Sequence, residues 1–282
     1  MKLYLDKEFR ELKEPVIMGI LNLTPDSFSD GGRFNRFDSA ILHAERMIKS
    51  GAEIIDVGGE STRPGALKVE INSEIDRVLP VIEKIKREFD ILISIDTYKD
   101  RVAELAVKEG GADIINDISA LSFSNDMADI VANLNVPVIL MHIKGTPSDM
   151  QKDPSYLDVV GEITEYFNDR IGFAISKGIK REKIILDPGI GFGKRVEDNI
   201  TIIRNIKKFR DLNLPVMIGL SKKSFLGIIG GIVNPDEREV ETISANLIAA
   251  LNGASVLRVH NVENCVRSVR ILKELVYSGS DG

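Results

Sequence analysis

The amino-acid sequence predicts an α/β fold, a single (β/α)8 TIM barrel that spans residues 1–282. Three observations predict it. Eight short apolar runs rich in Val and Ile do not alternate with polar residues, which is typical of strands buried on both faces of a parallel sheet. A helical pattern follows most of these runs, and such strict alternation favours a barrel. No linker, low-complexity tract or change in composition divides the chain.

A doubly wound open sheet is the alternative. It is disfavoured because no Gly-x-Gly-x-x-Gly pattern follows the first predicted strand. The expected strands are Val16–Leu21, Ile54–Val57, Ile91–Ile95, Asp113–Asn116, Val136–Met141, Lys183–Leu186, Val216–Leu220 and Ser255–Val259. The expected helices are Ser39–Ser50, Ser73–Phe89, Lys99–Glu109, Ser155–Lys177, Asp198–Phe209, Glu239–Asn252 and Val262–Leu275. Several of these helices end at a Gly, the usual stop signal, as at Gly51, Gly178 and Gly253.

Composition narrows the class of function. A net charge of −6 argues against general binding of nucleic acid or anionic membranes, so any phosphate recognition must be local. No run approaches the roughly 18 apolar residues of a membrane helix, and the charged first 14 residues lack the apolar core of a signal peptide. The single cysteine, Cys265, excludes an intrachain disulfide. We therefore expect a cytoplasmic enzyme or binding protein.

The segment from Ile20 to Gly32 changes abruptly from an apolar run to turn-forming residues. A strand that delivers Asn22 into a long loop bearing carboxylates is suited to a barrel rim, where the loop can close over a ligand. An ordinary surface loop would give the same local pattern.

In a barrel of this type the functional groups lie at the carboxyl ends of the strands. Every predicted strand ends in a polar or ionisable group there: Asn22, Asp56, Asp96, Asn116 with Asp117, Met141 with His142, Asp187, Lys222 with Lys223, and Arg258 with His260. A helix cap explains Asp117 or Ser224 equally well, but it does not explain why all eight strands share the feature. The rim is therefore predicted to be a functional cleft.

The charges of these groups indicate the ligand. Cationic and polar groups converge on a predicted anion site, formed by Asn22, Thr62, Arg63, Lys223, Arg258 and His260. The carboxylates of Asp96 and Asp187, with Asn116, suit a flat ring that carries N–H donors. Glycines at 189, 191 and 193 leave room for such a ring, although they could equally be a loop device. The inferred ligand is a polar heterocycle with a phosphate or pyrophosphate arm.

With these residues, the sequence resembles the dihydropteroate synthases, the folate-pathway enzymes that sulfonamides target. The resemblance covers nearly the whole chain, and its motifs are specific in their combination, order and spacing. They are Gly19–Gly32, Ile55–Gly65, Ile93–Thr97, Ile115–Asp117, Leu186–Lys194, Ser221–Ser224 and Arg258–His260.

The resemblance implies roles for the rim residues toward dihydropterin pyrophosphate. Asn22 would bind Mg²⁺, which bridges the pyrophosphate. The pyrophosphate itself would be held by Thr62, Arg63, Arg258 and His260. The pterin edge would be bound by Asp96, Asn116 and Asp187, with Lys223 at its carbonyl and ring nitrogen. Substrate-contacting wall positions would be Met141, Phe192 and Gly219, and the catalytic set would be Asp96, Lys223 and Arg63.

The second substrate implied by the resemblance is p-aminobenzoate, near Phe28 and Pro64 with its carboxylate by Ser224. The implied reaction releases pyrophosphate, leaves a pterin methylene cation supported by carboxylates such as Asp96, and lets the aniline nitrogen attack. No protein nucleophile is needed. A homodimer through the outer helices is also implied.

One residue departs from the pattern of the family, and one segment has no assigned role. Position 222 is Lys where the family usually has Arg, and Lys lacks the planar fork. The segment from Lys144 to Tyr156 carries no recognisable chemistry. The alternatives are a pterin-binding methyltransferase, which should lack the Asn22–Gly32 loop and the Arg-Val-His anion site, and a catalytically inactive barrel paralogue.

Overall fold

The strands form a parallel barrel, as the sequence predicts. The computed structural model describes residues 1–6, 8–24, 33–63 and 65–276. Its main sheet has the order β8-β7-β6-β5-β4-β3-β10-β9. An isolated bridge between Leu186 and Val216 joins β8 to the start of β9 and closes the sheet. The strands are β3 (Val16–Asn22), β4 (Ile54–Gly58), β5 (Leu92–Asp96), β6 (Ile114–Asp117), β7 (Val138–Met141), β8 (Ile184–Asp187), β9 (Met217–Ile218) and β10 (Val256–Val259).

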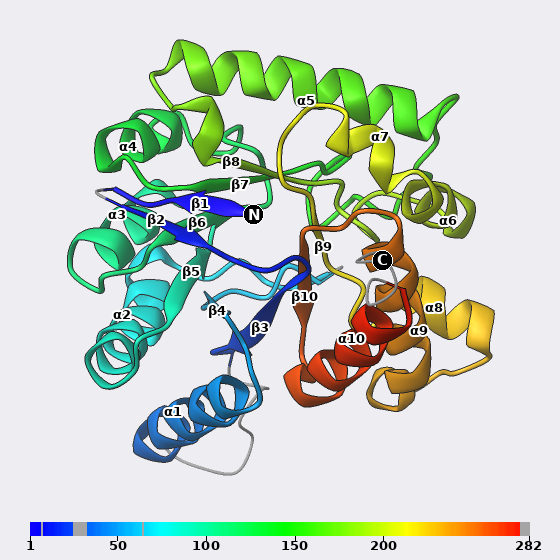
Figure 1. Ribbon diagram of the computed structural model, residues 1–282. Helices are drawn as coiled ribbons and strands as arrows, with labels where there is room; N and C mark the ends of the chain where they lie inside the picture. The colour runs from blue at the N-terminus through cyan, green and yellow to red at the C-terminus, as the bar shows by residue number, and fades with distance from the viewer. Residues whose placement is uncertain (7, 25–32, 64, 277–282) are drawn as a thin grey trace, which may run out of the picture.

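The helices surround the strands in chain order, from α1 round to α10 (Figure 1). Within the described residues they are α1 (Arg33–Lys49), α2 (Ile71–Glu88), α3 (Asp100–Lys108), α4 (Met127–Leu134), α5 (Val159–Ser176), α6 (Val196–Arg204), α7 (Ile206–Arg210), α8 (Ser224–Gly230), α9 (Glu239–Leu251) and α10 (Val262–Val276). None of these helices is long and apolar enough to cross a membrane.

Three expected elements differ from the sequence pattern: two are shorter and one is divided. The helix expected from Ser155 begins only at Val159, and the helix expected over 198–209 is divided at Asn205 into α6 and α7. The strand expected over Val216–Leu220 contains only two ladder residues.

The strand side chains divide into two apolar layers, which explains why the runs are continuous. One cluster lies between the strands and the helices. The other fills the inside of the barrel near the amino ends of the strands, with members such as Val16, Ile54, Leu92 and Val256. Both faces of every strand are therefore covered.

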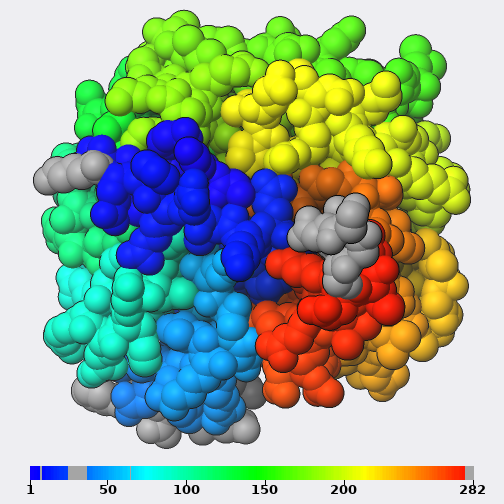
Figure 2. All heavy atoms as spheres, in the orientation of Figure 1, coloured from blue at the N-terminus to red at the C-terminus, as the bar shows by residue number. Residues whose placement is uncertain are grey.

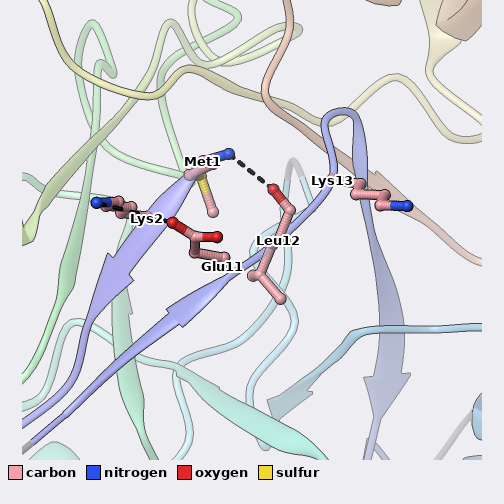
Figure 3. A pocket seen from close by; sticks show the side chains of 5 residues that line it. All are labelled: Met1, Lys2, Glu11, Leu12 and Lys13. Carbon is pink, nitrogen blue, oxygen red and sulfur yellow. Dashed lines mark hydrogen bonds and ion pairs between the residues drawn. The ribbon is translucent and has the colours of Figure 1, made fainter.

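An antiparallel hairpin that the sequence did not predict covers the amino end of the barrel. It consists of β1 (Lys2–Tyr4) and β2 (Phe9–Glu11), which lie in front of the barrel strands in Figure 1, and the dark-blue N-terminal residues form part of the face shown in Figure 2. Leu3 of this hairpin packs into the inner cluster. A hollow beside it is lined by Met1, Lys2, Glu11, Leu12 and Lys13 (Figure 3). This end lies opposite the carboxyl ends of the strands.

Candidate active site

The predicted rim residues form a continuous row because the strand register aligns them. Asn22 of β3 pairs with Gly58 of β4, and Gly58 pairs with Asp96 of β5. Asp96 in turn pairs with Asn116 of β6. A Cβ on Gly58 would lie 3.7 Å from both Asn22 Oδ1 and Asp96 Oδ2. Gly58 therefore lies between the side chains of Asn22 and Asp96.

Arg258 lies at the centre of a buried ionic cluster inside this rim. Its Nε donates to Asp56 Oδ2 at 2.6 Å, and its Nη2 donates to Asp96 Oδ2 at 2.6 Å. Asn116 Nδ2 donates to the same Asp56 oxygen at 3.2 Å. Asp56 is completely buried. The cluster thus joins β4, β5, β6 and β10 through one guanidinium.

The pKa of Asp96 is raised in this cluster, which contains two carboxylates for one cation. Burial is the largest cause, Arg258 opposes it, and the negative charge of Asp56 adds to it, giving a pKa of about 7. The same carboxylates raise the pKa of Arg258, which therefore stays charged. Asp96 therefore changes from its neutral to its ionised form as the pH rises through about 7.

Asp187 and Lys223 form a second pair of groups beside this cluster. Asp187 accepts the Gly189 N–H at 2.8 Å, and burial raises the pKa of its carboxyl. The Lys223 ammonium lies 4.2 Å from the centre of the Phe192 ring. Burial lowers the pKa of Lys223 to about 8, against the opposing effect of Asp187.

Apolar and open positions adjoin these groups. Met141 packs with Ile118, Ile143 and Met150, and Phe192 lies against this small cluster. A Cβ on Gly219 would meet no atom within 4 Å, so that position faces open space. The arrangement offers a flat ring an apolar wall beside buried polar groups.

The part of the rim that is expected to bind an anion contains several cationic side chains. The Nδ1 of His260 lies 2.9 Å from Ser221 Oγ. Burial, then the nearby charges of Arg258, Lys222, Arg63 and Lys223, lower the pKa of His260 to about 3. His260 is therefore neutral within a group of cations.

The positions expected at the edge of the site are less enclosed. Thr62 is half-buried, and Arg63 is exposed on the loop after β4. Ser224 is exposed and is the first residue of α8. Phe28, Pro64 and the segment 25–32 lie outside the described residues, so their predicted contacts with the second substrate are untested.

Lys222 has a left-handed backbone with φ of +60°. Arg238 Nη1 donates to its carbonyl at 3.0 Å, and its own N–H donates to Thr242 Oγ1 at 3.1 Å, which hold this conformation. Its Nζ pairs with Asp236 Oδ1 at 2.6 Å. The residue that replaces the usual Arg is thus paired with an exposed carboxylate at the edge of the cationic group.

Four residues have structural roles that sequence reasoning did not assign. Asp56 and His142 were placed on the rim without a role, and Glu60 and Lys194 lie within the quoted motifs. The Glu60 carboxylate accepts hydrogen bonds from the Tyr98 hydroxyl at 2.5 Å and from Lys99 Nζ at 2.7 Å, which ties the loop after β4 to the segment after β5. Their ionisable character was the available signal, but their partners come from other loops and are not visible in the chain order.

The described residues contain no group of three or more His, Cys, Asp or Glu side chains that could form a metal cage. Mg²⁺ often takes only one or two protein oxygens and completes its shell with substrate phosphates and water. The amide oxygen of Asn22, at the rim and near Asp96, is a hard oxygen donor of this kind. The residues present therefore fit a Mg²⁺ ion shared with a phosphate ligand.

The barrel and its rim define a pterin-binding enzyme, and a family model described as "Pterin binding enzyme" matches residues 18–260. The dihydropteroate synthase of Escherichia coli K12 is 44% identical over 97% of this chain and 96% of its own length. The chain belongs to the dihydropteroate synthase family. It is a transferase of this type, as the motifs predicted.

Solved structures agree in fold. A Yersinia pestis dihydropteroate synthase with a sulfonamide drug complex has a TM-score of 0.91 and 40% identity, covering 98% of this chain and 99% of that one. A Xanthomonas albilineans dihydropteroate synthase with 4-aminobenzoic acid has a TM-score of 0.92 and 39% identity, covering 98% of each chain. These similarities confirm the predicted barrel.

Proposed function

We propose that this rim condenses 6-hydroxymethyl-7,8-dihydropterin pyrophosphate with p-aminobenzoate, giving 7,8-dihydropteroate and pyrophosphate. The observation that carries the proposal is the pairing of two environments in one cleft. Buried carboxylates at Asp96 and Asp187 lie beside the cations of Lys223 and Arg258 and the neutral His260. A ring rich in N–H donors with a pyrophosphate arm matches both.

The pterin ring is proposed to bind Asp187, Asp96, Asn116 and Lys223. The Asn116 amide donates its N–H to Asp56, so its oxygen is left as an acceptor for the ring. A carboxylate such as Asp187 accepts paired donors from a ring N–H and an amino group. Lys223, packed on Phe192, supplies a donor to the ring carbonyl and nitrogen, while Met141, Phe192 and Gly219 bound the ring.

The pyrophosphate is proposed to bind Thr62, Arg63, Arg258 and His260. Neutral His260 can still donate one N–H, and the cations around it attract the anion. Asn22 would hold Mg²⁺ with the phosphates, and the ion would help neutralise charge that develops on the leaving group. Because Arg258 is already bonded to two carboxylates, we expect its effect on the pyrophosphate to be mainly electrostatic.

The reaction breaks the bond between the pterin methylene carbon and the pyrophosphate oxygen, and the oxygen keeps the electron pair. The resulting cation is delocalised into the ring, and ionised Asp96 stabilises it. The aniline nitrogen then donates its lone pair to the methylene carbon, and its proton passes to the released pyrophosphate or to water. The proposed catalytic set is Asp96, Lys223 and Arg63.

For p-aminobenzoate we propose a position by Ser224, with Phe28 and Pro64 nearby. The X. albilineans relative that holds 4-aminobenzoic acid supports this substrate. A homodimer through the outer helices is supported by exposed apolar side chains there: Ile228, Ile229, Val240, Ile248, Leu251, Ile271 and Leu275. A cytoplasmic location stays a prediction from the sequence.

The test is pyrophosphate release by the purified protein. We expect release to require the pterin pyrophosphate, p-aminobenzoate and Mg²⁺ together, and a sulfonamide to compete with p-aminobenzoate. Pterin binding without pyrophosphate release would instead favour an inactive paralogue.

A further inference from the structure

Lys194, at the end of the loop after β8, is a buried lysine to which the proposed reaction gives no role. Its side chain is almost completely enclosed. The ammonium donates to His142 Nδ1 at 2.9 Å and to the Phe192 carbonyl at 3.0 Å. The His142 carbonyl lies at 3.4 Å. None of these acceptors is a carboxylate, so the charge is held by neutral groups.

These contacts join the glycine-rich loop after β8 to the segment after β7. A Cβ on Gly189 would lie 2.0 Å from the His142 carbonyl oxygen, and one on Gly193 would lie 2.4 Å from the Lys144 carbonyl oxygen. Both glycines also have positive φ. The two backbones are therefore in direct contact, with Lys194 bonded to both.

The segment from Lys144 to Tyr156 completes the same support. Gln151 Nε2 donates to the Gly191 carbonyl at 2.6 Å, and the Tyr156 hydroxyl donates to the Gly193 carbonyl at 2.8 Å. The carbonyls of residues 191, 192 and 193 each accept a bond from a different side chain. The backbone at Phe192 is thus fixed on three consecutive residues.

Lys194 also acts on the charge of the pterin-binding groups. Burial raises the pKa of Asp187, whereas the cations of Lys223, Arg258 and Lys194 lower it. In the reverse direction, Asp187 is the strongest charge that favours protonated Lys194. A positive charge at Lys194 therefore favours the ionised form of Asp187.

We propose that Lys194 is a positioning residue for pterin recognition, which holds the backbone at Phe192 so that its ring packs against Lys223. The inference rests on the proposed pterin role of Asp187. The loss of Lys194 should affect the pterin half of the substrate and not the pyrophosphate half. Its ammonium bonds to His142 and Phe192 beside the proposed pterin pocket, and in the described part of the chain no hydrogen bond joins it to the residues proposed to bind pyrophosphate.

The charge of Lys194 changes within the physiological range. Burial lowers its pKa to about 7, so the ammonium loses a proton, and one donor, as the pH rises through neutrality. The charged and titratable groups around it come from each neighbouring element: His142 and Lys144 after β7, Asp187 of β8, Asp198 of α6, and Lys223 before α8. His142 stays neutral throughout, since burial lowers its pKa to about 2.

The test compares Lys194→Met with wild type by calorimetry, using 6-hydroxymethylpterin and inorganic pyrophosphate with Mg²⁺ as separate probes. At pH 6.5 we expect the variant to bind the pterin about tenfold or more weakly, and pyrophosphate within about twofold of wild type. The affinity of the wild type for the pterin should fall as the pH rises from 6 to 8, because Lys194 loses its proton in this range. The variant should lack the part of this fall that Lys194 causes. Lys152→Met, an exposed lysine on the supporting segment, is the matched control.

A second variant, His142→Leu, keeps the amine and removes one acceptor. We expect His142→Leu to lose pterin affinity selectively as well, but by a smaller factor than Lys194→Met. Near-wild-type pterin binding by both variants would overturn the inference. So would an equal loss of pterin and pyrophosphate binding, because that pattern is a general loss of structure. If wild type itself bound no pterin, the proposed function rather than the role of Lys194 would fail.

Discussion

At the scale of single residues, the carboxylates of Asp56 and Asp96 compete for one guanidinium. We expect the rate of turnover to rise with pH along a limb with an apparent pKa near 7, since Asp96 must be ionised to stabilise the cation. Asp56→Asn removes the neighbouring negative charge, so that Asp96 becomes the only carboxylate paired with Arg258. The apparent pKa of the pH profile should therefore fall by about one unit. The pH profile of kcat measures this shift.

Asp129→Asn, which removes an exposed carboxylate on α4, is the control for that shift. The same raised pKa also affects stability. At Asp96 the folded state binds more protons than the unfolded state from about pH 4 to about pH 7, so the contribution of this carboxyl to the free energy of unfolding should fall as the pH rises through this window, whereas the neutral His142 and His260 contribute with the opposite sign. An unmoved limb in Asp56→Asn would contradict the coupling of the two carboxylates.

Asp236 presents a second charge effect at residue scale. Lys222 lowers the pKa of this exposed carboxyl, so it is ionised beside Lys222, Arg63 and His260. It therefore competes with a bound anion for Lys222. Water screens this charge, so its removal should have a small effect: Asp236→Asn should bind inorganic pyrophosphate about threefold more tightly. Inhibition by pyrophosphate measures this change.

The adjacent Glu237→Gln tests whether any lost negative charge has the same effect, and it should leave the inhibition constant nearly unchanged. Weaker pyrophosphate binding by Asp236→Asn would mean that Asp236 orients Lys222 instead of competing for it.

At the scale of elements, the loop after β4 carries Thr62 and Arg63 and is held by Glu60. The Glu60 carboxylate accepts the Val69 N–H at 2.7 Å as well as Tyr98 and Lys99. Glu60→Gln should free this loop, raising KM for both substrates, with a loss of only about 1–2 kcal/mol in unfolding free energy. Hydrogen exchange over residues 61–69 should become faster. The exposed Glu83→Gln on α2 is the control, and unchanged exchange would exclude an anchoring role.

At the scale of the whole molecule, the periodic strands were predictable and the parts without a period were not. Residues such as Val16 and Ile54 lie in continuous apolar runs because both strand faces are buried, so the barrel followed from the pattern. The β1–β2 hairpin was missed because its three-residue strands carry little pattern of their own. The rim row from Asn22 to Asn116 followed from strand ends alone. The partners of Arg258 and Lys194 could not be predicted in this way. Asp56 and His142 lie 202 and 52 residues away in the chain, and the contacts depend on the directions of the side chains.

The two ends of the barrel should therefore separate stability from catalysis. Leu3 of the hairpin is buried in the inner cluster at the end opposite the rim. Leu3→Ala removes that packing and should lower the free energy of unfolding by about 2–4 kcal/mol, while kcat and KM at 25 °C stay near wild type. Urea unfolding and steady-state kinetics measure the two effects. Leu157→Ala, at a fully exposed leucine, should change neither. A loss of kcat in Leu3→Ala that is not explained by unfolded protein would mean that the hairpin holds the rim in its active geometry.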